Sequence, residues 1–301
     1  MTDFFKPSIS YWAGSGTEIR DTALQVPSGA LNQRSLVLLV HGYNNDVQDA
    51  SDAFKRFLSL QQSSRTIGAN LVGVYWPGAN WSGPLYYMAA VSQAKKVAVT
   101  FARDLYEQAI KGGNYLKVDF VAHSLGCRLT LETIKELVRI KQNNPSLGGL
   151  VLGRVVFMAG AVPTRYLDDL QFLRGAITAF GGTMSLFSED DLVLHWAFPA
   201  GQTAAWEGFF PVALGRKKWS GDNFLAPPIQ QIRNPNAGHG DYWGGDDDHL
   251  DRKAFAAGKV AEFIQIGEQL PRSIHSADAS LVRDVVPRKV EGARTVKGRV
   301  V

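Results

Sequence analysis

The residues of this chain that are best suited to chemistry surround Ser124. An apolar run at residues 117–123 leads directly into this serine, and an amphipathic stretch at residues 125–142 follows it. A strand that turns sharply into a helix is the sequence form of a nucleophile elbow, which lifts a serine above a parallel sheet. The turn needs small neighbours, and Gly126 is one of them. Ala122 is a mild departure, because glycine is usual at both flanking positions.

A serine hydroxyl is a weak nucleophile, so it needs an adjacent base and donors for the oxyanion that develops. The N–H of Leu125 lies at the positive N-terminal end of the expected helix. A second apolar run, residues 35–40, ends in His41-Gly42, after which the N–H of Tyr43 can face the serine. We predict Tyr43 and Leu125 as the oxyanion donors, and we expect His41 to order its loop.

Six histidines are candidates for the base. His239 lies in a loop flanked by glycines, directly before the last expected helix. A base that serves both nucleophile and leaving group suits such a loop. His123 adjoins the serine but is expected to point elsewhere, and His195 is expected to be packed. We therefore predict His239 as the general base.

The acid that orients the histidine is expected just after the strand predicted at residues 183–188. Asp191 is preferred, because the apolar residues 192–194 can anchor its loop. Asp190 stays open as the alternative acid, and Glu189 competes with it. With Ser124 and His239, either choice gives the chain order nucleophile, acid, base.

Apolar runs alternate with helical patterns along most of the chain. Alternation of this kind implies right-handed crossovers and a mainly parallel central sheet with helices on both faces. Residues 1–34 could add one or two edge strands. The expected strands are 35–40, 71–76, 117–123, 153–160 and 183–188, and the expected helices are 46–58, 84–111, 125–142 and 248–268.

The chain resembles an α/β-hydrolase, and it is similar to a bacterial branch of hydrolases defined only as a domain of unknown function. The resemblance implies an α/β-hydrolase fold, a Ser-His-Asp triad and no cofactor. It does not imply a substrate, because this fold supports many chemistries. The resemblance spans about residues 35–268 and rests on residues 40–45, 75–77, 121–126, 188–191 and 238–242.

The length of 301 residues fits one α/β domain at 1–270, with its core at 35–268 and a possible lid or cap loop at 196–238. The net charge of +4 arises in residues 271–301, where seven basic residues face three acidic ones. We expect a basic, weakly ordered tail that could contact an anionic partner weakly. The balanced charge of the body argues against a nucleic-acid partner.

The beginning of the sequence lacks the pattern of a secretory signal, and no apolar run is long enough for a transmembrane segment. A single cysteine excludes an internal disulfide, so a cytoplasmic location is predicted. The sequence has no Cys/His spacing typical of zinc, and the acidic group at 246–249 suits a helix start. We expect no cofactor and no metal.

These features together predict a serine hydrolase that cleaves carboxylic esters through an acyl-enzyme. Two segments rich in aromatic residues, 76–88 and 196–224, could form an apolar pocket for a small-molecule or lipid ester. A lipase or phospholipase that acts on lipid is the alternative. A binding protein that has this fold but no catalytic activity is the second alternative.

Overall fold

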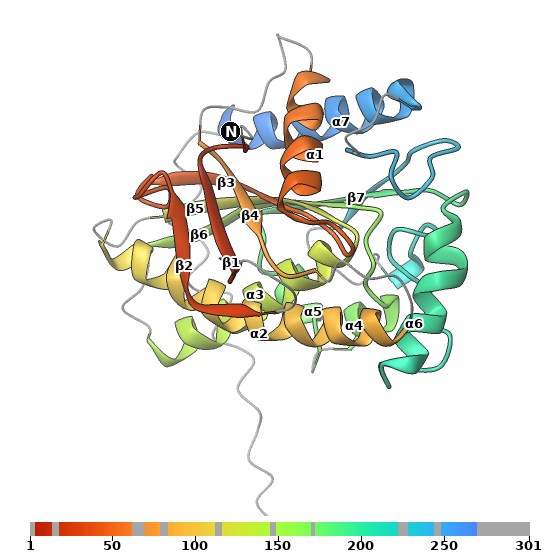
Figure 1. Cartoon of the computed structure of the whole chain (residues 1–301), viewed down its shortest axis with the longest axis horizontal. Helices are drawn as coiled ribbons and strands as arrows, with labels where there is room; N and C mark the ends of the chain where they lie inside the picture. Colours follow the sequence, from red (N-terminus) through yellow and green to blue (C-terminus); the bar gives the residue numbers. More distant parts are fainter. Residues whose placement is uncertain are drawn as a thin grey trace, which may run out of the picture. The chain divides into compact units, whose positions relative to one another are not determined.

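Figure 1 shows the computed structural model of the chain. Met1–Glu268 forms one compact unit by its internal contacts. The predicted tail at 271–301 and residues 246 and 247 lie outside the described residues, so those expectations stay predictions. The structure describes residues 4–13, 18–61, 70–78, 84–111, 116–144, 149–169, 172–221, 228–243 and 248–269.

The centre of the molecule is an eight-stranded sheet with the order β2-β1-β4-β3-β5-β6-β7-β8. The β1–β2 pair is antiparallel, and every other pair is parallel. The strand that carries the predicted nucleophile, β5, lies between β3 and β6 near the middle of the sheet. The strands are β1 (Ser8–Trp12), β2 (Ile19–Val26), β3 (Ser35–Val40), β4 (Leu71–Tyr75), β5 (Leu116–His123), β6 (Leu150–Met158), β7 (Gly182–Phe187) and β8 (Gln230–Arg233).

Helices cover both faces of the sheet, as predicted. Helices α1 and α7 lie on one face, and α2 to α5 lie on the other (Figure 1). Within the described ranges, no helix has the length and hydropathy needed to cross a bilayer. The helices are α1 (Val47–Ser59), α2 (Pro84–Lys111), α3 (Leu125–Asn143), α4 (Thr164–Asp168), α5 (Arg174–Ile177), the π-helix η2 (Val193–Ala197), α6 (Phe198–Ala204) and α7 (Leu250–Gln269).

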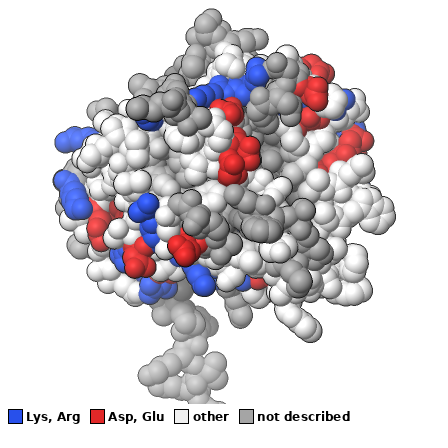
Figure 2. All heavy atoms as spheres, in the orientation of Figure 1, with Lys and Arg blue, Asp and Glu red and all other residues white. Residues whose placement is uncertain are grey.

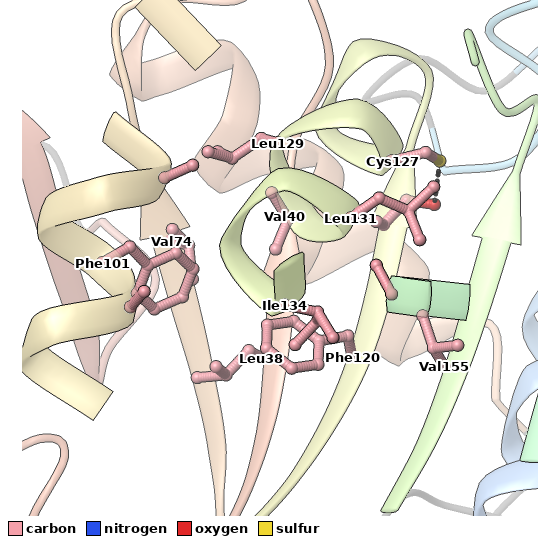
Figure 3. Packing of buried hydrophobic residues seen from close by; sticks show 14 of the residues in the cluster. Leu38, Val40, Val74, Phe101, Phe120, Cys127, Leu129, Leu131, Ile134 and Val155 are labelled. Carbon is pink, nitrogen blue, oxygen red and sulfur yellow. Dashed lines mark hydrogen bonds between the residues drawn. The ribbon is translucent and has the colours of Figure 1, made fainter. Parts of the chain in front are cut away.

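The sheet forms where the sequence has apolar runs, because its central strands are buried on both faces. In β3, every residue after Ser35 is buried. Figure 3 shows the packing on the α2 and α3 side, where Leu38, Phe101 and Phe120 lie together. Cys127 belongs to this core as a small buried side chain, and its thiol donates to the Ala122 carbonyl at 3.3 Å.

Local signals place the first helix as expected. Asp46 is the N-cap of α1, and its side chain accepts the backbone N–H of Asp49. The Asp49 side chain in turn accepts the backbone N–H of Asp46, which completes a capping box. Ala50, Phe54 and Phe57 are buried against the sheet.

The region after β7 contains more regular structure than its sequence indicates. No element is expected at residues 196–247, but η2, α6 and β8 lie wholly or partly there. These elements are short, and β8 has the polar sequence Gln-Gln-Ile-Arg. Neither the helical nor the strand period can be recognised over so few residues.

The start of α3 lies unusually close to the end of β3. A Cβ atom on Gly126 would come within 2.3 Å of the His41 carbonyl oxygen and 2.7 Å of the Val40 oxygen. Both contacts are with backbone atoms, so a side chain here requires the helix and the strand to separate. Gly126 therefore permits the close approach that the elbow requires.

We predict that Gly126→Ala lowers the free energy of unfolding by about 1–3 kcal/mol, because overpacking strains a close-packed region. Gly258→Ala is the matched control, because Gly258 lies within α7 and a Cβ there would meet no atom within 4 Å. Alanine is the better helix former, so the control should gain roughly 0.5–1 kcal/mol. Urea unfolding measures both, and equal effects of the two substitutions would contradict the close approach.

Candidate active site

Ser124 lies at the turn between β5 and α3 in a backbone conformation that few residues adopt. Its φ is 52° and its ψ is −124°, which is unfavourable for a residue with a side chain. The backbone N–H of Ser124 donates to the Met158 carbonyl at 2.9 Å, and its own carbonyl accepts the N–H of Ala161 at 3.1 Å. Hydrogen bonds to the end of β6 and to the loop after it therefore hold the strained turn in place.

The loop after β3 lies directly against this serine. A Cβ atom on Gly42 would come within 2.8 Å of the Ser124 Cβ, so only glycine fits there. The backbone N–H of Trp76 donates to His41 Nε2 at 3.2 Å, which places the His41 proton on Nδ1, 2.9 Å from the Gly42 carbonyl. Burial lowers the pKa of His41 to about 4. His41 is therefore neutral and orders the loop, as expected.

The structure brings His239 to Ser124 across 115 positions of sequence. The Ser124 hydroxyl lies 2.8 Å from His239 Nε2, and Asp191 Oδ2 lies 2.8 Å from His239 Nδ1. A carboxylate only accepts hydrogen bonds, so the Nδ1 proton donates to Asp191 and Nε2 accepts the serine proton. In this tautomer the ring can remove a proton from Ser124.

The two candidate acids have different surroundings. Asp191 is fully buried, and its Oδ1 accepts the backbone N–H of Leu194 at 2.9 Å. The side chain of Asp190 is about half exposed, and its carboxylate lies 3.6 Å from Arg233. Glu189 also faces Arg233, at 3.4 Å. Of these three carboxylates, only that of Asp191 lies within hydrogen-bonding distance of His239.

Two side chains that the sequence analysis does not assign a role hold the loop of His239. The buried ring of His123 donates from Nε2 to the carbonyl of His239 at 2.8 Å. Asp241 accepts the backbone N–H of Gly238 at 2.8 Å and pairs with Arg252 of α7 at 2.9 Å. His123 thus points away from the serine hydroxyl, as expected, and it fixes the backbone that carries the base.

The expectation that His195 is packed is wrong. His195 is exposed, and its Nδ1 accepts a hydrogen bond from Arg216 at 3.1 Å. The residue lies within η2, where the chain turns Leu194 inward and His195 outward. The sequence after β7 shows no periodicity that would distinguish these two directions.

A mainly apolar cavity of about 370 Å³ opens beside Ser124 and His239. Its walls come from the loop after β3, from α2 and from the η2–α6 segment, which lies in the predicted cap region from residue 196 onward. Phe198 and Ala200 line it, but Trp196 and the other exposed aromatic residues of this region do not. The lining also includes Tyr43, Asn44, Tyr87, Ala161, Val193, Leu194, Ala197 and Gly201.

A second cleft, of about 470 Å³, lies beside His239 and shares Tyr43 and Asn44 with the apolar cavity. Its character is different, because Asp49 and Asp52 of α1 contribute to its wall. The candidate site thus has an apolar cavity and a polar cleft with His239 in the lining of both.

The fold defines the structural class of this protein. The eight-stranded, mostly parallel sheet covered by helices, with the elbow at the end of β5, is an α/β-hydrolase fold. Residues 25–165 match the model of a family described as "alpha/beta hydrolase of unknown function (DUF900)". The predicted resemblance to such a branch is confirmed over these residues. The search of curated proteins finds no significant match.

Several solved structures are similar to this chain at low identity. A predicted CIB-like hydrolase from Thermoplasma acidophilum is 16% identical, with a TM-score of 0.39, over 78% of this chain and 87% of its own. A thermophilic esterase from Thermogutta terrifontis is 14% identical, with a TM-score of 0.38, over 80% and 85%. Aspergillus fumigatus lipase B is 12% identical, with a TM-score of 0.37, over 78% and 63%.

The buried ring of His123 makes stability depend on pH. Burial, aided by the neighbouring His239, lowers the pKa of His123 from 6.5 to about 3. Between these values the unfolded chain binds a proton at His123 that the folded chain does not bind. The free energy of unfolding therefore falls as the pH decreases through this window.

We predict that His123→Phe reduces the slope of the free energy of unfolding against pH by about 1.4 kcal/mol per pH unit between about pH 6 and pH 4. The reason is that the unfolded variant no longer binds a proton at position 123. Phenylalanine keeps a ring beside Tyr242 and Trp243, which His123 contacts. Urea unfolding at several pH values measures the two slopes. Parallel curves for the two proteins would mean that His123 is protonated in the folded state.

Proposed function

We propose that this protein is a serine hydrolase that cleaves carboxylic esters. One observation carries the proposal, namely the continuous chain of hydrogen bonds from Ser124 through His239 to the buried carboxylate of Asp191. A nucleophile, a base and an acid that orients the base are the three parts that acyl transfer to serine requires.

In the first half of the proposed reaction, Ser124 Oγ attacks the ester carbonyl carbon while His239 Nε2 takes the hydroxyl proton. The negative charge moves to the carbonyl oxygen. Backbone N–H groups of Tyr43 and Leu125 stabilise this oxyanion, and each such donor contributes about 3–4 kcal/mol in comparable enzymes. In support, Leu125 is the first residue of α3, where N–H groups lack partners within the helix. Gly42 holds the backbone next to Tyr43 against the serine.

The bond to the alcohol oxygen then breaks, and His239 gives its proton to the departing alcohol. In the second half, His239 removes a proton from water, and the resulting hydroxide attacks the acyl-enzyme. Collapse of the second tetrahedral intermediate releases the carboxylic acid, and the proton returns to Ser124. Asp191 stabilises the positively charged ring in both halves.

The two hollows beside His239 support a division of the substrate. The acyl chain would occupy the apolar cavity, where the side chains of Tyr87 and Phe198 contribute large hydrophobic surfaces. The alcohol would leave through the polar cleft at α1. The proposed substrate is therefore an ester with an apolar acyl group. A cytoplasmic location and a weak anionic contact of residues 271–301 remain predictions from the sequence.

We predict that a fluorophosphonate probe forms a single adduct with the wild type, and that Ser124→Ala forms none. The probe reacts with a serine whose proton a neighbouring base can take, and removal of the hydroxyl removes the reacting atom. Intact mass measures the adduct, and hydrolysis of p-nitrophenyl hexanoate should be lost in parallel. An unchanged thermal transition is the control for folding. A folded wild type that forms no adduct would contradict the proposal and favour a binding protein without catalytic activity.

We also predict that the two neighbouring aspartates differ in importance. Asp191→Asn should lower kcat by about 10³–10⁴-fold, because an amide at this position favours the wrong histidine tautomer. Asp190→Asn is the matched control, since it changes the same group one position away on an exposed side chain, and its kcat should stay near that of the wild type. The reverse order of the two effects would assign the acid to Asp190.

A further inference from the structure

The region after β7 exposes an unusual amount of apolar surface. Seven of the thirteen large apolar side chains that are exposed in the described part of the chain lie within residues 192–212. We call four of these residues the aromatic rim: Trp196, Trp206, Phe209 and Phe210. Trp206 is 91% exposed and Phe209 is 83% exposed. In Figure 2 the margin where Figure 1 places α6 is largely white, without charged groups.

The backbone holds the aromatic rim in position at a conformational cost. Trp206 has a φ of 57° and Phe210 a φ of 42°, which bulky residues rarely adopt. Between them, Glu207 is anchored to the body by an ion pair with the buried Arg128 at 3.2 Å and by a hydrogen bond from Tyr166 at 2.8 Å. Lys95 also pairs with the Glu207 carboxylate. The exposed aromatic side chains therefore project from an anchored turn.

Basic side chains share this surface with the aromatic rim. One groove is lined by Trp196 and Phe210 together with Arg216 and Lys217. Its one carboxylate, that of Glu189, lies 3.4 Å from Arg233. Lys217 and Lys218 are exposed, and no described carboxylate lies within ion-pair distance of either. Aromatic residues with adjacent unpaired lysines are typical of surfaces that rest on anionic lipid, because the rings enter the interface and the lysines meet headgroup charges.

The same segment leads into the candidate active site. Val193 is 45% exposed on the outside and also lines the apolar cavity beside Ser124. Its neighbours in η2 and α6, Ala197 and Phe198, line the cavity as well. The outer surface of this segment carries the aromatic rim, and its inner surface forms a cavity wall.

We propose that the aromatic rim, with Lys217 and Lys218, docks this protein on an anionic lipid surface. Docking places the mouth of the apolar cavity next to the lipid, so esters held in the lipid layer are the substrate class. The substrate class rests on the proposed function, whereas docking itself does not.

The test is sedimentation of the full-length protein with vesicles made of equal parts of phosphatidylcholine and phosphatidylglycerol. The wild type should bind. The triple variant Trp206→Ala, Phe209→Ala, Phe210→Ala should bind at least about tenfold more weakly, because it lacks the three rings that enter the lipid on docking. The matched control is Leu24→Ala, Val99→Ala, Ile110→Ala, which removes three exposed apolar side chains elsewhere. The control should bind like the wild type.

A second pair of variants tests the charge. Lys217→Gln with Lys218→Gln should weaken binding by about fivefold or more on the anionic vesicles and not on pure phosphatidylcholine. Arg288→Gln with Lys289→Gln removes two charges from the tail and is the matched control. If the tail pair, and not the lysine pair, abolishes binding, docking belongs to the tail and the proposal is overturned.

The remaining outcomes are equally decisive. No vesicle binding by the wild type, or equal binding by the triple variant, overturns the proposal. If the wild type instead forms dimers that the triple variant loses, the occupant of the rim is a second copy of the chain. Ser124→Ala should bind vesicles like the wild type. A wild type that docks but forms no fluorophosphonate adduct would remove the proposed function alone, and a wild type that forms the adduct but does not dock would remove docking alone.

Discussion

The strained turn at Ser124 is the constraint on which the rest of the site depends. A positive φ at this residue forces β5 to end abruptly and α3 to begin directly beside the carboxyl end of β3. The approach is possible only because Gly126 and Gly42 lack side chains. Main-chain hydrogen bonds to the end of β6 offset the strain, so the nucleophile is positioned by backbone contacts and not by its own rotamer.

Burial governs the polar groups around this turn. A carboxylate without exposed surface must have hydrogen-bond donors, and Asp191 obtains them from the Leu194 backbone and from His239. The rings of His41 and His123 are buried too, and burial keeps both neutral. Neither ring therefore adds a positive charge next to the imidazole of His239. Asp191 is therefore the only one of these three buried groups that carries a charge.

Much of the fold can be predicted where the sequence carries strong local patterns. Continuous apolar runs mark β3 to β7, and small residues around Ser124 mark the elbow. Apolar patterning does not identify β8, because this edge strand is polar, and it does not predict that His195 points outward. It cannot separate Asp190 from Asp191 either, because adjacent side chains point in different directions that only the fold decides. The aromatic residues expected to form a pocket divide in the structure, with Phe198 inside and Trp206 in solvent. The catalytic roles stay predictions.

The strand order also gives Ser124 and His239 local surroundings of different stability. Ser124 follows a strand at the centre of the sheet, whereas His239 follows β8, a four-residue strand paired on one side only. Edge elements with few buried contacts open more often than central ones. Local opening of β8 would withdraw the base and leave the serine in its turn. Amide hydrogen exchange in residues 230–239 would then be faster than in β5, and partial denaturation would inactivate the protein while most of the sheet remains folded.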